Sequence, residues 1–212
     1  MDDKTARFIE LFNKAKATYE DSETRLAAEG WEEPWQVLIA TIMSAQNRDP
    51  LTIQVSEELF TKYSSIQELA EAPYEDILEV LSSVNYNRNK SKYIKQTAQM
   101  LAKDDGNVPD TMKELLKYPG VGRKTANLLL SEVFEKPAIC VDTHVHRLSN
   151  VFDLVDTDKP DQTERELKKV APKKYWRHIN RYFVLWGQDV AGHDKEKLLD
   201  ALVDHPVQEH DL

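Results

Sequence analysis

The chain has 212 residues, of which 37 are acidic and 28 basic, so its formal net charge is −9. A chain of this length can bury a sizeable core, in one large or two small domains. The single cysteine, Cys140, excludes both an internal disulfide and a cysteine metal cluster within this sequence. No apolar run approaches the roughly eighteen residues that cross a membrane, and no signal peptide is recognisable, so we expect a cytoplasmic protein.

The basic residues are unevenly placed in this acidic chain. No acidic residue occurs between Glu79 and Asp104, a segment that carries Arg88, Lys90, Lys92, Lys95 and Lys103. A second basic stretch runs from Arg165 to Arg181, with seven basic residues against Glu166 alone. Such stretches are either solvated helix faces or contacts for an anionic partner.

Apolar residues recur at helical spacing along most of the chain. An N-terminal amphipathic helix lies within residues 1–28, and Trp35 to Gln46 reads as an almost wholly apolar, buried helix that opens after Pro34. Further helices are expected over 51–63, 65–72, 75–83 and 91–103, and later over 162–170, 175–186 and 194–204. An aromatic stripe in 175–186 is typical of a core, and we expect an all-α protein.

A helix, a tight turn and a second helix are predicted over residues 111–134. Thr111 begins the first helix, and Tyr118-Pro119 ends it because the residue before proline is driven out of the helical region. Gly120 and Gly122 permit a tight turn and the close approach of another molecule, and a new helix begins at Arg123. Outward amides at a helix start bind anions, of which nucleic acid is the commonest with repeating phosphates.

The run from Tyr118 to Ala126, YPGVGRKTA, is followed by VDTHVHR from Val141 to Arg147, with Asp142 eighteen positions after Lys124. Together with Ser44-Ala45-Gln46, this pattern resembles the helix-hairpin-helix DNA glycosylases of the endonuclease III type, and the helical order can be followed from about Trp35 to Gly187. The resemblance implies that Lys124 is a nucleophile, that Asp142 is catalytic, and that the partner is duplex DNA with a damaged base or abasic site.

The chemistry of these two residues agrees with that assignment. A neutral lysine amine can attack C1′ of the sugar, and a carboxylate can take its proton and stabilise positive charge as the base leaves. The resulting Schiff base permits beta-elimination of the 3′ phosphate. The alternative is a solvated Lys124 and an Asp142 that only caps the helix beginning near Thr143.

The resemblance also implies residues that contact DNA. Gln46 would fill the gap left by a flipped nucleotide, with a helix-end polar residue as the alternative. Tyr86 would wedge into the opposite strand, or else pack under its own loop; Asn85 stands where the family has glycine and tolerates left-handed backbone angles. His144 would contact phosphate or only form local hydrogen bonds. The remaining candidates are Arg88, Lys90, Gly120, Val121, Gly122, Arg123 and Thr125.

The C-terminal segment departs from the family. Most relatives carry four cysteines that bind an iron-sulfur cluster, whereas the corresponding positions here hold Ala191, Leu198, Ala201 and Val207. We therefore expect no cofactor and no metal centre, with a small hydrophobic cluster in place of the iron-sulfur cluster. A monovalent cation at the hairpin carbonyls stays open.

The resemblance implies two helical domains with a DNA-binding cleft between them. The first is a six-helix domain over residues 29–136 that carries the hairpin, and the second combines 1–28 with 137–212. We predict a monomeric base-excision glycosylase with AP-lyase activity on damaged, oxidised pyrimidines. The alternatives are an alkylated-base or uracil/thymine-mismatch glycosylase, and a non-catalytic helix-hairpin-helix DNA-binding protein.

Overall fold

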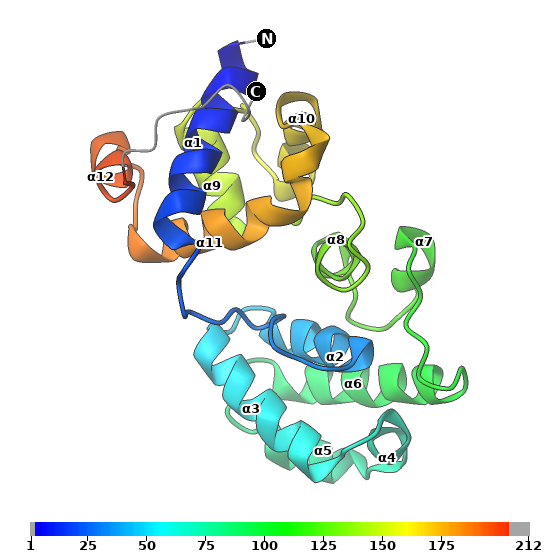
Figure 1. The fold of residues 1–212 in the computed structure, drawn as a ribbon. Helices are drawn as coiled ribbons and strands as arrows, with labels where there is room; N and C mark the ends of the chain where they lie inside the picture. The colour runs from blue at the N-terminus through cyan, green and yellow to red at the C-terminus, as the bar shows by residue number, and fades with distance from the viewer. Residues whose placement is uncertain (1–2, 204–212) are drawn as a thin grey trace. The chain divides into compact units, whose positions relative to one another are not determined.

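The computed structural model describes residues 3–203, and within this range every regular element is helical. The chain forms two compact units, one of Arg25–Phe134 and one of the residues up to Thr24 together with those from Glu135 onward (Figure 1). The predicted all-α fold is confirmed. None of the described helices has the length and apolar character needed to cross a membrane.

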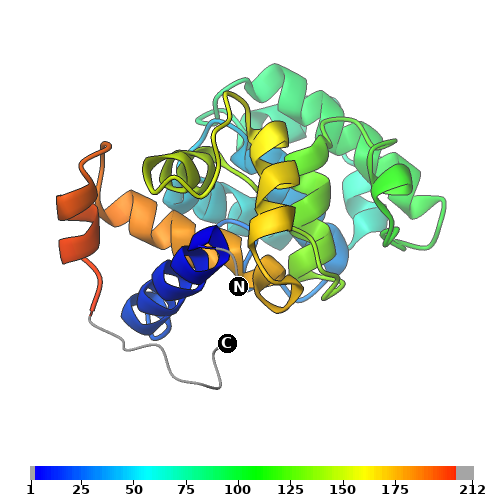
Figure 2. The same ribbon diagram turned by 90° about the horizontal axis from the view of Figure 1, so that it is seen from above.

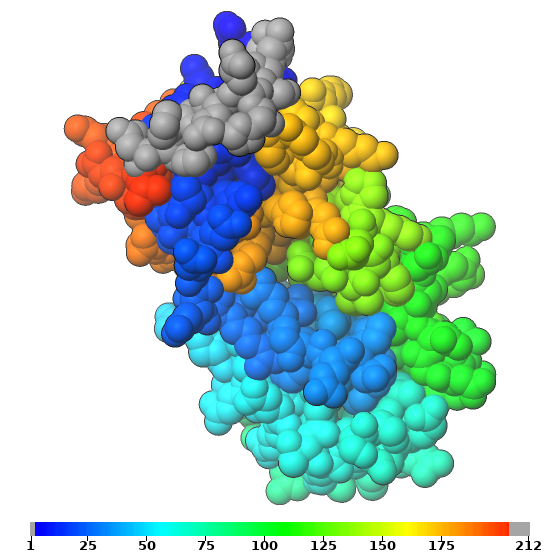
Figure 3. Space-filling model, viewed as in Figure 1, coloured from blue at the N-terminus to red at the C-terminus, as the bar shows by residue number. Residues whose placement is uncertain are grey.

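The unit Arg25–Phe134 contains seven helical segments, of which α7 and α8 are the two hairpin helices that the sequence predicted. They are α2 (Pro34–Ser44), α3 (Asp49–Lys62), α4 (Ile66–Glu71), α5 (Tyr74–Val80), α6 (Asn87–Ala102), α7 (Met112–Leu115) and α8 (Arg123–Glu132). The apolar α2 is the buried centre, as predicted, and contacts α3, α6 and α8. In the space-filling view the side chains of α2 and α3 lie against one another (Figure 3).

Two lysines of α6 bond to the C-terminal ends of other helices in this unit. Lys90 Nζ donates to the carbonyls of Met43 and Ala45 at the end of α2, at 2.8 and 2.5 Å. Lys95 Nζ donates to the carbonyl of Ala70, at 2.8 Å, and to that of Ala72 at the end of α4. The last carbonyls of a helix have no partner inside it, so each lysine caps a helix C-terminus and complements its negative dipole end.

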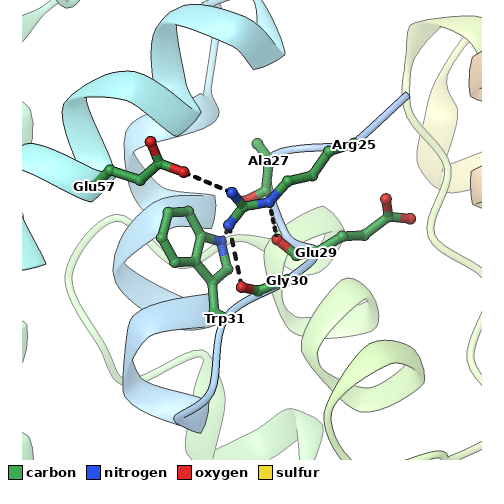
Figure 4. Close-up of polar contacts among 6 residues, drawn as sticks. All are labelled: Arg25, Ala27, Glu29, Gly30, Trp31 and Glu57. Carbon is green, nitrogen blue, oxygen red and sulfur yellow. Dashed lines mark hydrogen bonds and ion pairs between the residues drawn. The ribbon is translucent and has the colours of Figure 1, made fainter. Parts of the chain in front are cut away.

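The segment that leads into α2 is held by Arg25 (Figure 4). Its guanidinium donates to the carbonyls of Glu29 (2.7 Å) and Gly30 (3.2 Å) and pairs with Glu57 of α3 at 2.7 Å. The same group stacks 4.2 Å from the centre of the Trp31 ring. The two carbonyl bonds fix the turn at Glu29 and Gly30, and the pair with Glu57 links this segment to α3.

The other unit consists of α1 (Asp3–Tyr19), α9 (Thr143–Val151), α10 (Pro160–Val170), the 3-10 turn η1 (Lys173–His178), α11 (Ile179–Asp189) and α12 (Lys195–Asp200). α1 packs on α10 and α11, and α11 on α9 (Figure 2). Its core is aromatic: Phe8, Phe12, Tyr175, Tyr182, Phe183 and Trp186 contact one another. The aromatic stripe is therefore core, as the sequence predicted.

Candidate functional site

The hairpin between α7 and α8 is a tight turn whose two glycines have different surroundings. Gly120 has φ +81°, and a Cβ there would lie 3.0 Å from Tyr93 Cδ2 and 3.1 Å from Ile42 Cγ2. Gly122 has φ −102° and is the N-cap of α8, with nothing within 4 Å of an added Cβ. The fold itself therefore requires glycine at 120, while the space beside Gly122 is open to a ligand.

α8 begins immediately after this open position. Gly122 offers no side-chain cap, so the amides of the first turn, Arg123 to Thr125, receive no bond from it. Arg123 and Lys124 are exposed, whereas the Thr125 side chain is buried. Two exposed cationic side chains at the positive end of a helix dipole favour an anion at this surface.

Val121 was predicted to contact DNA, and the structure changes its role. Its side chain is buried, and its amide donates to the carbonyl of Tyr118 at 3.1 Å. Both groups are thus used inside the hairpin. Thr97 of α6 contributes from below, because its hydroxyl donates to the carbonyl of Pro119 at 3.3 Å. Val121 and Thr97 therefore shape the turn.

Two further turns of the same unit present the candidate insertion residues. Gln46 follows the end of α2 and is exposed, with φ 58°. Tyr86 precedes α6, also with φ 58°, and is 63% exposed, so it does not pack under its own loop. The sequence suggested Asn85 as the residue with a left-handed backbone, but that residue is Tyr86. Asn85 uses its amide differently, since its Nδ2 donates to the Gln46 carbonyl at 2.8 Å.

Lys90 was also predicted to contact DNA, and the structure corrects this. Its side chain is only 5% exposed, and its ammonium is turned inward to the carbonyls at the end of α2. A buried donor with two partners cannot reach a phosphate. The basic residues of this stretch that lie at the surface are Arg88, Lys92 and Lys103.

Asp142 is the N-cap of α9, in the other unit. Its Oδ1 accepts from the amide of Val145 at 2.8 Å, which fixes the orientation of a half-buried carboxylate. Burial lowers the pKa of the nearby Arg147 guanidinium, and the negative charge of Asp142 acts in the opposite direction. The capping bond predicted as the alternative role is therefore present, and it is compatible with a catalytic role for the same group.

The two histidines after Asp142 have different surroundings. His146 Nδ1 lies 2.7 Å from the hydroxyl of Thr163, and Asn150 also bonds to this residue, so it belongs to a local network. His144 is half-exposed and packs against Gly187 of α11. Of the two, His144 is the one whose ring is not held in that network.

The second basic stretch is largely paired within its own unit. Lys168 pairs with buried Glu164 at 2.6 Å, Lys169 with Glu166 at 2.7 Å, and Arg177 with Glu135 at 2.9 Å. Arg181 donates to the carbonyl of Ser22 at 3.1 Å. These contacts favour the solvated-face interpretation for this stretch.

The four C-terminal positions that were expected to form a small hydrophobic cluster differ in burial. Leu198 is fully buried and Ala201 is half-buried, whereas Ala191 is exposed and does not join them; Val207 lies outside the described residues. Trp186 Nε1 donates to the Leu198 carbonyl at 2.9 Å. Within residues 3–203 no group of three or more His, Cys, Asp or Glu side chains could hold a metal ion.

An arginine that the sequence analysis did not single out holds the loop before α12. The Arg147 guanidinium donates to the carbonyls of Gly187 (2.8 Å), Val190 (3.0 Å) and Gly192. In the sequence, Arg147 was visible only as part of VDTHVHR. Its role could not be predicted, because its three acceptors are backbone carbonyls forty or more positions away in the chain.

A helical fold with a glycine hairpin that opens α8 at Arg123, followed by Lys124, is typical of helix-hairpin-helix proteins. Residues 39–173 match the family described as HhH-GPD superfamily base excision DNA repair protein. The chain therefore belongs to the HhH-GPD superfamily of base excision DNA repair proteins, and it is endonuclease III-like.

Particular relatives agree with this. Endonuclease III of Thermotoga maritima is 44% identical over 160 residues, which are 75% of each chain. Endonuclease III of Synechocystis is 35% identical over 193 residues, 90% of this chain and 87% of the relative. A solved structure of a trapped endonuclease III–DNA covalent intermediate has a TM-score of 0.82 at 32% identity and covers 95% of this chain and 96% of that one. The predicted resemblance is confirmed.

Proposed function

We propose that this protein is a base-excision DNA glycosylase with AP-lyase activity, which acts as a monomer on damaged pyrimidines in duplex DNA. The observation that carries the proposal is the exposed Lys124 in the first turn of α8, directly after the open Gly122, in a chain 44% identical to an endonuclease III. The enzyme acts in the cytoplasm, where it meets the DNA. We also propose that residues 29–136 form one domain, that residues 1–28 and 137–212 form the other, and that the DNA binds in a cleft between them.

Lys124 and Asp142 carry the chemistry in this proposal. Asp142 accepts the proton that leaves the lysine ammonium, and the neutral amine attacks C1′ while the bond to the base breaks with its electron pair on the base. Ring opening gives a Schiff base. Loss of a C2′ proton then expels the 3′ phosphate, and hydrolysis of the imine returns the lysine. A trapped covalent intermediate of an endonuclease III supports this sequence.

The remaining candidates are assigned to DNA contact. The first-turn amides of α8, with Arg123 and the backbone of Gly120, Gly122 and Thr125, bind phosphate, and Arg88 and His144 add contacts outside the hairpin. Gln46 occupies the gap left by the flipped nucleotide, and Tyr86 stacks in the opposite strand.

The test is borohydride trapping on duplexes that contain thymine glycol, uracil, an alkylated base or an abasic site. Lys124→Arg keeps the positive charge but cannot form a Schiff base, and Lys113→Gln, an exposed lysine of α7, is the matched control. We expect adducts for the wild type and the control, and none for Lys124→Arg. Trapping that survives Lys124→Arg would remove Lys124 from its role. The absence of any adduct would favour a monofunctional enzyme or a DNA-binding module.

We further propose that the enzyme works without an iron-sulfur cluster. Alanine and leucine side chains cannot ligate iron, and the segment is already held by Arg147, by the Trp186–Leu198 bond and by the burial of Leu198. Stoichiometric iron in the purified protein, with the visible absorbance of such a cluster, would contradict this. The monovalent cation at the hairpin stays a prediction, tested by the potassium dependence of DNA binding.

A further inference from the structure

Gln46 and Tyr86 lie on two turns that are forty positions apart in the chain, and both have the same unusual backbone conformation. Each has φ 58°, in the left-handed region. For a residue with a Cβ, this region costs about 1 to 2 kcal/mol and persists only where the surroundings hold it. Tyr86 is in addition a large aromatic side chain left 63% exposed.

Two asparagines join these turns directly. The backbone amide of Asn85 donates to Asn47 Oδ1 at 3.0 Å, and Asn85 Nδ2 donates to the Gln46 carbonyl at 2.8 Å. Asn47 Nδ2 donates in turn to the Met43 carbonyl at 2.9 Å. Each asparagine thus bonds to the backbone next to an exposed side chain, and the two turns cannot move apart without breaking both links.

Lys90 ties the same two turns together from the interior. It lies on the first turns of α6, which Tyr86 opens, and its ammonium bonds to the carbonyls of Met43 and Ala45, just before Gln46. The Lys90 amide also donates to the Tyr86 carbonyl at 3.0 Å. One buried side chain therefore connects the residue before Gln46 to the helix that begins after Tyr86.

We propose that Asn47, Asn85 and Lys90 are positioning residues that hold Gln46 and Tyr86 as one preassembled, two-pronged element, so that both side chains enter the duplex together. The inference rests on the proposed function, since it assumes that these side chains insert into DNA. Preassembly removes the entropy cost of ordering two separate turns during binding. The three residues therefore assist the displacement of the nucleotide and leave the later chemistry unchanged.

The test compares an abasic site in a duplex with the same site in a single strand. In the single strand there is no partner strand to displace, so the trapping rate reports the lysine chemistry alone. Asn85→Ala removes the link to Gln46 without backbone strain, because Asn85 does not have a positive φ. Asn87→Ala is the matched control, since Asn87 Nδ2 bonds to the Ser82 carbonyl within its own turn.

For Asn85→Ala we expect the duplex trapping rate to fall about three- to tenfold, the range of one lost hydrogen bond, with the single-strand rate unchanged. Lys90→Met should give the same pattern, provided that it folds, while Asn87→Ala should match the wild type on both substrates. An equal loss on both substrates would mean a general structural role, and a duplex rate at the wild-type level would mean no positioning role; either would overturn the inference.

A double-mutant cycle sharpens the test. Gln46→Ala and Tyr86→Ala should be non-additive on the duplex in the wild type, because the two side chains act as one element. In the Asn85→Ala background their effects should become additive. Additive effects in both backgrounds would overturn the inference. If the wild type trapped neither the duplex nor the single-stranded site, the proposed function would fail instead, so the two failures can be distinguished.

Discussion

Gly187 lies so close to His144 that no side chain fits between them. A Cβ on Gly187 would stand 2.6 Å from His144 Nδ1 and 2.7 Å from His144 Cβ. The contact forms where α11 packs against α9, the helix that Asp142 caps. The absence of a side chain at position 187 thus sets how closely the candidate catalytic helix approaches the aromatic core.

Gly187→Ala should therefore destabilise the protein by about 1 to 3 kcal/mol, the usual cost of overpacking. The methyl group meets the backbone-proximal atoms of His144, which cannot move away without shifting α9. Urea denaturation followed by circular dichroism measures the loss. The double variant Gly187→Ala with His144→Ala should recover part of it, because the ring is removed while the Cβ at 2.7 Å remains. A failure to recover any would mean that the His144 ring carries none of the strain.

The two hairpin glycines should separate stability from binding. Gly120→Ala combines a positive φ with contacts at 3.0 and 3.1 Å and should lower the melting temperature. Gly122→Ala meets no atom within 4 Å and should change stability by less than about 1 kcal/mol. It should nevertheless weaken binding to a duplex with a reduced abasic analogue, measured by fluorescence anisotropy, because its Cβ occupies the space for the phosphate. Unchanged binding would remove Gly122 from the interface.

Asp142 can be tested by separating its charge from its capping bond. Asparagine caps helices as well as aspartate does, so Asp142→Asn should keep stability while it abolishes the proton acceptor. Asp142→Ala loses both functions and should cost about 1 kcal/mol in addition. We expect both variants to lose glycosylase turnover, measured on a damaged-base duplex, but only Asp142→Ala to lose stability. Wild-type turnover in Asp142→Asn would reduce Asp142 to a cap.

Burial lowers the pKa of Lys90 to about 8, which makes stability depend on pH. In the unfolded chain a lysine titrates near 10.4, so between about pH 8 and 10.4 the unfolded state binds more protons than the folded state. Stability from this group therefore rises with pH across that window, by at most about 3 kcal/mol. The difference in unfolding free energy between the wild type and Lys90→Met, measured from pH 7 to 10, should grow in favour of the wild type. A constant difference would mean that Lys90 titrates normally.

Local signals in the sequence predicted the helices, because apolar spacing, Pro119 and the hairpin glycines act within a few residues. Gly122 caps the start of α8 where it was expected, whereas α7 ends at Leu115, three residues before Tyr118. The directions of Lys90 and Lys95 could not be predicted in this way. Each lysine bonds to helix-end carbonyls that are distant in the chain, 47 positions away for Lys90. A stretch of basic residues has the same sequence pattern whether its lysines point inward or outward.

In the candidate site, too, local motifs could be predicted from the sequence and contacts between distant segments could not. Lys124 and Gly122 belong to one short motif and could be located from sequence alone. The link from Asn85 to Gln46 depends on two turns meeting in space, so the sequence suggested only that Asn85 tolerates a left-handed backbone, a conformation that Tyr86 adopts instead. At the C-terminus, the apolar residues at the family's cysteine positions predicted a buried Leu198 but could not reveal that Ala191 is exposed.

Arg25 gives a test of the segment that enters α2. Its Nε, Nη1 and Nη2 each donate to a different acceptor, and its planar group stacks on Trp31 (Figure 4). A lysine ammonium carries the same charge but cannot reproduce this fork or the stacking. Arg25→Lys should therefore lower the unfolding free energy by about 1 to 2 kcal/mol, as judged by urea denaturation.

The ion pair with Glu57 should contribute little of this, because the Glu57 side chain is 57% exposed and water screens the charges. Glu57→Gln should therefore cost less than about 0.5 kcal/mol, and salt should hardly change the loss in Arg25→Lys. If Glu57→Gln cost as much as Arg25→Lys, the charge pair would hold the segment and the carbonyl bonds would not. A much smaller cost for Glu57→Gln than for Arg25→Lys would show that Arg25 holds the segment by its geometry, since a lysine ammonium can satisfy only part of what the guanidinium binds.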